Sequence, residues 1–228
     1  MPGMSILYQV RRTGRRSKNI SVRVDRNGVV RVGAPTWASL KEINRVVHMH
    51  AQWIAERVAD AREIAPRYEH GAPHFYLGKR YPLALRRPAD RDDVSFDGRH
   101  LIVAVAEPTA ERVRDLLRRW YRVQANDVLT KRIARFADLP WLKVTPNWRL
   151  RRMRSQWGSC MESGDITLNT QLVKASLGLI DYVILHEFAH IKHHDHGRGF
   201  ERLMDHHMAD WRSRRRDLNT LGPAILAD

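Results

Sequence analysis

The chain has 228 residues, long enough to bury a sizeable core, and its 40 Lys and Arg residues against 25 Asp and Glu residues give a formal net charge of +15. No apolar run approaches the length of a membrane span and the N-terminus lacks the apolar stretch of a signal peptide, so we expect a cytoplasmic protein with no membrane partner. The single cysteine, Cys160, excludes an internal disulfide framework, and we expect it to be a small buried hydrophobe rather than a metal ligand.

Residues 1–107 are predicted to form a β-rich accessory region with one helix. Alternating apolar residues predict strands near residues 8–10, 20–24 and 29–32, and the last two flank the hairpin turn Asp25-Arg26-Asn27-Gly28. Ser39 and Glu42 form a capping box that opens the helix, whose apolar side continues to Val58. Further short strands are expected at 75–77, 81–85 and 101–105.

Residues 108–228 are predicted to form a second region. A long amphipathic helix over 109–137 starts after Pro108 and carries an apolar stripe of Val, Leu, Trp and Tyr residues. Two strands, 148–155 and 165–168, are expected to flank the turn Glu162-Ser163-Gly164. A strand edge can bind an extended chain by backbone hydrogen bonds, but the sequence does not say which strand would do so.

The pentapeptide His186-Glu187-Phe188-Ala189-His190 is an H-E-x-x-H motif, on a helix predicted over about residues 178–192. Positions i and i+4 of a helix lie on one face, so His186 and His190 can reach one metal ion. Imidazole nitrogen suits Zn²⁺, and three protein ligands leave a fourth position for water, as in catalytic sites. Glu187 is then placed to accept a proton from that water as a general base. Histidines that merely cap a core or face solvent are the competing interpretation.

The third metal ligand is chosen from four nearby histidines: His193, His194, His196 and His206. A helical continuation would carry His193 past the metal. The segment Asp195-His196-Gly197-Arg198-Gly199 is typical of a chain reversal with Gly at positive φ, and a new helix is expected from Phe200. We therefore prefer His196 to His193, because catalytic zinc needs three converging ligands.

Three further segments carry a family resemblance: Arg154-Ser155-Gln156-Trp157-Gly158-Ser159-Cys160, Gly164-Asp165-Ile166-Thr167-Leu168-Asn169 and Ile180-Asp181-Tyr182-Val183-Ile184-Leu185-His186-Glu187. With them the chain resembles the YgjP-like predicted metal-dependent hydrolases, zincin-type metallopeptidase domains related to the SprT-like proteases. The N-terminal segment 11–20, residues 29–35, Gln52-Trp53-Ile54 and Asp210-Trp211-Arg212 resemble the same family, so the likeness extends over nearly the whole chain.

The resemblance implies an α+β fold whose C-terminal part is a zincin-like metallopeptidase domain. It also implies a zinc-dependent peptidase with His186, His190 and His196 as metal ligands and Glu187 as general base. We expect one Zn²⁺ per chain, for which Ni²⁺ or Co²⁺ could substitute, and a peptide or protein substrate. Tyr182, Arg154 and His193 are all candidates for stabilising the oxyanion, and the sequence does not choose among them.

Basic residues cluster at Arg11 to Lys18, Arg149 to Arg154 and Arg212 to Arg216. A surplus of this size makes nucleic acid a candidate partner, with binding that would weaken steeply as salt rises. Two alternative functions therefore stay open. One is a nucleic-acid-binding protein whose metal site is structural or inactive, and the other is a metal-dependent hydrolase of a non-peptide bond. The oligomeric state is not predicted.

Overall fold

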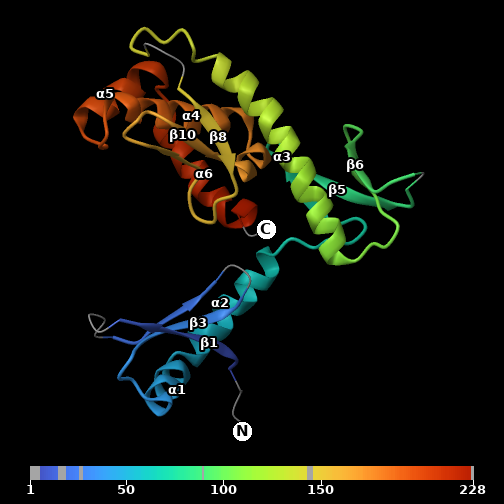
Figure 1. Cartoon of the computed structure of the whole chain (residues 1–228), viewed down its shortest axis with the longest axis vertical. Helices are drawn as coiled ribbons and strands as arrows, with labels where there is room; N and C mark the ends of the chain where they lie inside the picture. Colours follow the sequence, from blue (N-terminus) through green and yellow to red (C-terminus); the bar gives the residue numbers. More distant parts are fainter. Residues whose placement is uncertain (1–5, 15–18, 26–27, 89, 143–145, 227–228) are drawn as a thin grey trace. The chain divides into compact units, whose positions relative to one another are not determined.

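The computed structural model describes residues 6–14, 19–25, 28–88, 90–142 and 146–226. The protein has a mixed α+β fold and divides into two compact units, the first extending to Ala65 and the second running from Pro66 to Leu226 (Figure 1). The structure therefore divides after Ala65, whereas the sequence analysis placed the boundary between residues 107 and 108. None of the helices in the described ranges combines the length and apolar character needed to cross a bilayer.

The sheet of the first unit has the strand order β1-β3-β2, with β1 at Tyr8–Thr13, β2 at Ser21–Val24 and β3 at Val30–Pro35. β1 runs parallel to β3, whereas β2 is antiparallel to it. The predicted hairpin between β2 and β3 is confirmed, and Gly28 has a φ of 75°, which favours glycine. Arg26 and Asn27 of this turn lie outside the described residues.

Two helices, α1 (Leu40–Met49) and α2 (Ala51–Ile64), follow this sheet, where the sequence analysis expected one. The capping box is confirmed, because the Ser39 hydroxyl accepts from the backbone N–H of Glu42 and the Glu42 carboxylate accepts from that of Ser39. The single predicted helix is interrupted at His50, whose φ of −102° and ψ of 16° depart from helical values. Buried Ile43, Val47 and Ile54 nevertheless pack in one core with the sheet.

The second unit begins with a sheet of order β4-β5-β7-β6, formed by β4 (Pro73–Tyr76), β5 (Lys79–Arg86), β6 (Asp93–Phe96) and β7 (Leu101–Ala104). β6 was not predicted. At the β4–β5 turn, Leu77 and Gly78 have φ values of 48° and 82°, and their N–H groups donate to the carbonyls of Val173 and Lys174 in the 3-10 helix η1 (Thr170–Lys174). This long-range contact agrees with a unit that starts at Pro66, because residues of the β4-β5-β7-β6 sheet share one core with α3, η1 and the C-terminal helices.

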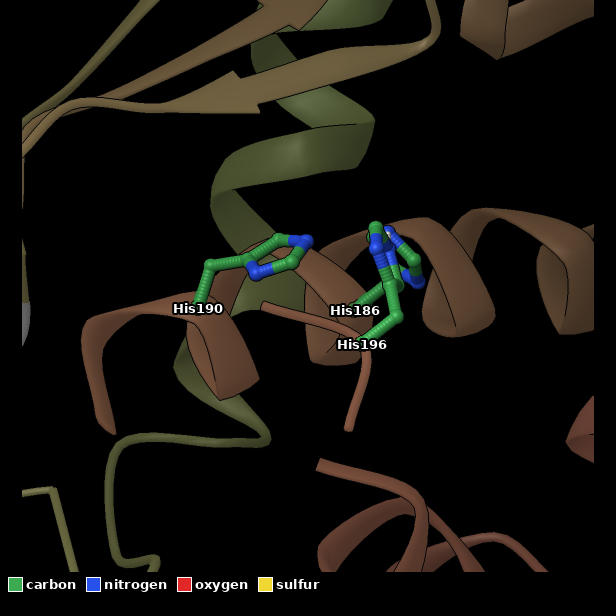
Figure 2. Close-up of side chains that lie close together, drawn as sticks. All are labelled: His186, His190 and His196. Atoms are coloured by element: carbon green, nitrogen blue, oxygen red, sulfur yellow. Dashed lines mark hydrogen bonds between the residues drawn. The ribbon is translucent and has the colours of Figure 1, made fainter. Parts of the chain in front are cut away.

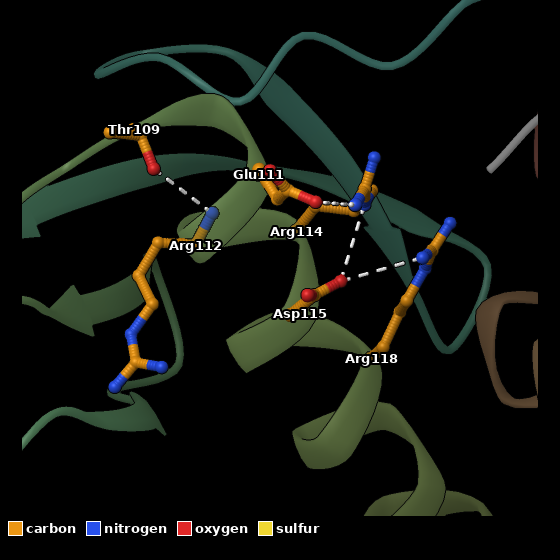
Figure 3. Close-up of polar contacts among 6 residues, drawn as sticks. All are labelled: Thr109, Glu111, Arg112, Arg114, Asp115 and Arg118. Atoms are coloured by element: carbon orange, nitrogen blue, oxygen red, sulfur yellow. Dashed lines mark hydrogen bonds and ion pairs between the residues drawn. The ribbon is translucent and has the colours of Figure 1, made fainter.

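The long helix α3 (Ala110–Ala134) confirms the predicted amphipathic helix, three residues shorter at its C-terminal end. The Thr109 hydroxyl caps it by accepting from the backbone N–H of Arg112 (Figure 3). Figure 3 also shows the surface network in which Arg114 pairs with Glu111 and Asp115, and Asp115 with Arg118. The opposite side of the helix is apolar and buried, with Val113, Leu116, Leu117, Tyr121, Ala125, Leu129 and Ile133.

A second sheet in this unit has the order β8-β10-β9, with β8 at Trp148–Arg151, β9 at Gly158–Cys160 and β10 at Ile166–Asn169. The predicted strand over 148–155 is wrong in its second half, because β8 ends at Arg151. β8 runs parallel to β10. The strand that precedes the turn at Gly164 is β9, which pairs antiparallel with β10. Among the described residues β9 is therefore an edge strand of this sheet.

Three helices complete the unit: α4 (Leu177–Lys192), α5 (Arg198–His207) and α6 (Trp211–Leu226). The predicted helix over 178–192 is confirmed as α4. Arg132 on α3 donates two hydrogen bonds to the Asp181 carboxylate on α4, and the two side chains are only 16% and 13% exposed. Removing one partner of a buried ion pair leaves the other charge unpaired, so this bidentate contact fixes α4 against α3.

Candidate metal centre

Helix α4 presents His186 and His190 on one face because they are one helical turn apart. The rest of the helix is largely buried, and Ile180, Ile184 and Phe188 are 0% exposed in the core. These three residues are four positions apart and form one apolar stripe along the helix. Burial of this stripe fixes the rotation of the helix about its axis, so both imidazoles lie at the surface of the core rather than inside it.

Figure 2 shows the three rings of His186, His190 and His196 turned toward a common space. One potential ligand atom from each residue lies within 4.8 Å of the others. The Nε2 atoms of His186 and His196 are 3.2 Å apart. Two nitrogens bound to one tetrahedral zinc ion are separated by about 3.3 Å, so this pair already has the spacing of two ligands.

The hydrogen bond of His190 and the charge state of His186 and His190 agree with a metal site. Nδ1 of His190 lies 3.0 Å from the carbonyl oxygen of His193, to which it can donate, and this leaves its Nε2 free as a ligand. Nδ1 of His186 is buried without a hydrogen-bond partner among the described residues. Burial, followed by the neighbouring His190 and His196, lowers the pKa of His186 to about 3, and burial also lowers the pKa of His190. Neutral imidazoles with a free lone pair are the form that binds a metal ion.

His196 lies in the segment between α4 and α5, and this segment brings it back over α4. Helix α4 ends at Lys192, and the next residue, His193, has extended dihedral angles, so its side chain leaves the helical face that carries His186 and His190. The reversal does not use glycine at positive φ as expected, because Gly197 has a φ of −71°. Instead the Asp195 carboxylate accepts from the Gly197 N–H at 3.0 Å, an Asx-type turn that starts α5. His193, His194 and His206 are not part of the three-histidine group.

Glu187 lies beside the histidines, but it is not part of the group that could hold a metal. Its side chain is 6% exposed, and burial raises its pKa to about 7. A carboxylate whose pKa lies near neutrality is suited to accept and return a proton at physiological pH. A nearby divalent cation would favour its ionised form.

A cavity of about 230 Å³ opens beside His186, Glu187 and His196. Its walls come from β9 and the residues just before it, from α4 and from α6. Of the three oxyanion candidates, Tyr182 lines this cavity, whereas Arg154 and His193 do not. Arg215 and Asn219 line it from α6 and were not predicted as site residues; in the sequence, Arg215 is only one member of a basic run.

The structure shows why the Trp157-Gly158-Ser159-Cys160 segment has glycine at position 158. A Cβ atom placed on Gly158 would lie 2.6 Å from Oε1 of Glu187 and 2.7 Å from its Cγ. Because Glu187 is buried, its side chain cannot move aside without disturbing its neighbours. Glycine therefore allows β9 to approach the carboxylate closely. Cys160, two residues further along β9, is half-buried, and burial raises the pKa of its thiol.

The substitution Gly158→Ala is therefore expected to displace the Glu187 carboxylate. If Glu187 is the general base expected from the sequence, a displacement of about 1 Å can cost about a hundredfold in rate, so we expect a loss of that order in kcat/KM for hydrolysis with metal content unchanged. Ser159→Ala is the matched control, since successive strand residues point to opposite faces. Wild-type kcat/KM in the Gly158→Ala variant would show that the close approach has no catalytic importance.

The basic clusters occupy different environments. Arg11 and Arg12 are exposed on β1, and the remaining basic residues of the first cluster lie outside the described residues. Arg149 is exposed on β8, where its Nε donates to the Thr167 hydroxyl. In the third cluster Arg212 pairs with Asp205, Arg214 pairs with Asp210, and Arg215 lines the cavity. Nucleic-acid binding by these clusters stays a prediction.

The comparison that decides the family is a match to the model of the YgjP-like metallopeptidase domain over residues 18–221. The chain belongs to the YgjP-like family. At family level this YgjP-like protein is a metal-dependent hydrolase of the metallopeptidase type, which implies a divalent metal ion and a peptide or protein substrate.

Among solved structures, the YgjP-like protein is similar to the metallopeptidase zymogen jannalysin of Methanocaldococcus jannaschii, with 19% sequence identity and a TM-score of 0.34. The match covers 42% of this chain and 94% of jannalysin. No curated protein matches the chain.

Proposed function

We propose that this YgjP-like protein is a zinc-dependent peptidase whose second unit is a zincin-like catalytic domain. The observation that carries the proposal is the convergence of three imidazoles beside a buried carboxylate at an open cavity. His186, His190 and His196 would hold one Zn²⁺ ion, and neutral nitrogen ligands are the donors that zinc prefers. When bound, the ion supplies a Lewis acid that polarises a peptide carbonyl and makes a water molecule more acidic.

Glu187 acts as the general base in this proposal. Its carboxylate takes a proton from the attacking water and returns it to the leaving amine as the peptide bond breaks. Burial keeps the carboxylate out of bulk solvent, and the glycine at position 158 leaves room for it at the cavity wall. Tyr182 lines the same cavity and packs edge-on against His186, so its hydroxyl is the candidate for stabilising the oxyanion.

Strand β9 is the proposed binding edge for the peptide backbone. The N–H of Asn169 donates to the carbonyl of Trp157 and the N–H of Met161 donates to the carbonyl of Asp165, so these residues face β10. In an antiparallel pair, the intervening Gly158 and Cys160 then point their backbone N–H and C=O groups to the open side. A substrate can add there as a further strand, next to Glu187.

Metal removal tests the function. Protein stripped with a chelator is expected to lose hydrolysis of an unfolded protein substrate, and about one equivalent of Zn²⁺ should restore it. Metal analysis should accompany each rate, and circular dichroism should show that the stripped protein remains folded. Undiminished cleavage by folded protein that contains no metal would disprove a metallopeptidase mechanism.

A further inference from the structure

Arg215 is a cation on the wall of the catalytic cavity without a carboxylate partner among the described residues. Its neighbours on α6 are paired: Arg212 with Asp205, and Arg214 with Asp210. Arg215 instead lines the cavity together with His186 and Glu187. Its charge is close enough to act on the pKa of Tyr182, which burial raises and Arg215 lowers.

Helix α6 is held so that Arg215 stays at this position. At its start, Nη1 of Arg214 donates to the carbonyl of Gly178 at 2.8 Å, which ties α6 to the beginning of α4. Further along, a Cβ on Gly222 would lie 3.6 Å from the Trp157 ring, so the helix packs closely against the segment that enters β9. Positions 215, 219 and 222 share one helical face, so Arg215 and Asn219 lie on the side of α6 that meets the cavity.

The composition of the cavity wall favours an anion. Glu187 is its one acidic residue, and it is buried, whereas Arg215 is exposed to solvent. A guanidinium group presents a planar fork of N–H donors that matches the two oxygens of a carboxylate. The side-chain amide of Asn219, one turn further on, can donate an additional hydrogen bond.

We propose that Arg215, assisted by Asn219, binds a carboxylate of the peptide substrate close to the bond that is cleaved. This inference rests on the proposed peptidase function, and it makes Arg215 a specificity-determining residue. The carboxylate has two sources in a peptide: an Asp or Glu side chain, or the free C-terminus. A preference for an acidic side chain is expected of an endopeptidase that cleaves acidic sequences. A preference for the free C-terminus is expected of an enzyme that cleaves near C-terminal ends.

The test measures binding without turnover, using zinc-loaded Glu187→Gln protein and four versions of one unstructured peptide. The peptide contains either Glu or Gln at one central position, and each version has either a free or an amidated C-terminus. We expect at least one peptide with a carboxylate to bind about tenfold more tightly than the Gln amide peptide. A gain in affinity of about tenfold is what one hydrogen bond between charged groups contributes. The Glu amide and Gln free-acid versions distinguish the two sources.

Adding Arg215→Ala to this protein is expected to abolish the preference, and Arg215→Lys to retain part of it, because Lys keeps the charge but not the fork. Arg216→Ala is the matched control, since Arg216 is an exposed neighbour that does not line the cavity. Equal affinity for all four peptides, or a preference that survives Arg215→Ala, would overturn the proposal.

Steady-state kinetics with an active enzyme separate this role from one in transition-state stabilisation. Arg215→Ala should raise KM for the preferred carboxylate peptide and so remove its advantage in kcat/KM over the Gln amide peptide. An equal fall in kcat for all four peptides would assign Arg215 to the oxyanion and contradict carboxylate binding. If no peptide is cleaved, the peptidase function fails, whereas the binding measurements still decide whether Arg215 selects carboxylates.

Discussion

Replacing Glu187 by Gln is expected to lower peptide hydrolysis by at least about a hundredfold while one zinc ion stays bound, because a positioned general base contributes about a hundredfold or more. Gln keeps the size of the side chain but not the basicity that proton transfer needs. Burial of the Glu187 side chain, which raises its pKa to about 7, makes the neutral amide easy to accommodate. Thermal stability should therefore be retained or slightly increased.

The measurement compares kcat/KM on an unfolded protein substrate with the zinc content of the same samples. Glu201→Gln provides a matched control, because Glu201 is an exposed glutamate on α5 that does not line the cavity. Similar rates for active wild type and Glu187→Gln would show that Glu187 is not the base. Loss of zinc in that variant would instead place Glu187 in the coordination shell.

Removing the histidines is expected to abolish zinc binding in a graded way. His186→Ala and His190→Ala should each eliminate stoichiometric zinc, since both ligands come from the rigid helix α4. His196→Ala should weaken binding strongly, because its Nε2 lies beside that of His186. His193→Ala should bind zinc as wild type does, because His193 is outside the three-histidine group and its hydrogen bond to His190 uses the backbone carbonyl, which alanine keeps.

Metal analysis after dialysis gives the stoichiometry, and thermal unfolding with and without added zinc gives an independent readout. A ligand that binds only the folded state raises the melting temperature, so the zinc-dependent rise should disappear in the variants that lose the site. His194→Ala is a second control, since His194 is exposed and outside the group. Undiminished zinc in the His186→Ala/His190→Ala double variant would end the metal-centre hypothesis, and stronger loss in His193→Ala than in His196→Ala would reverse the choice of third ligand.

The predictions that agree with the structure rest on contacts between residues near in sequence. The capping box of Ser39 and Glu42 spans three residues, and His186 and His190 span one helical turn. The stripe of α3 follows the helical repeat in the same way. Such patterns are visible in the sequence because helix geometry relates neighbouring positions directly.

The errors concern contacts between residues distant in sequence. The hydrogen bonds from Leu77 and Gly78 to η1 join segments almost 100 residues apart, and no local pattern in the sequence indicates them. The short strand β9 was not predicted, because three residues are too few to show an alternation of apolar and polar side chains. It is a strand because it pairs with β10. The break between α1 and α2 at His50 likewise has no glycine or proline to mark it.

By itself, the sequence determined the family and the candidate residues of the centre: two histidines and a glutamate on one helix, and a short list of third histidines. Only the tertiary structure shows that His196 lies next to His186 and that Gly158 contacts Glu187. It also shows that Arg215, one member of a basic run in the sequence, lines the cavity. The physical reason is that ligand type depends on the side chain and local helical spacing, which are encoded residue by residue. The shape and charge of a cavity depend instead on how separate elements pack, and α6 takes its place only through its contacts with α4 and with the segment before β9.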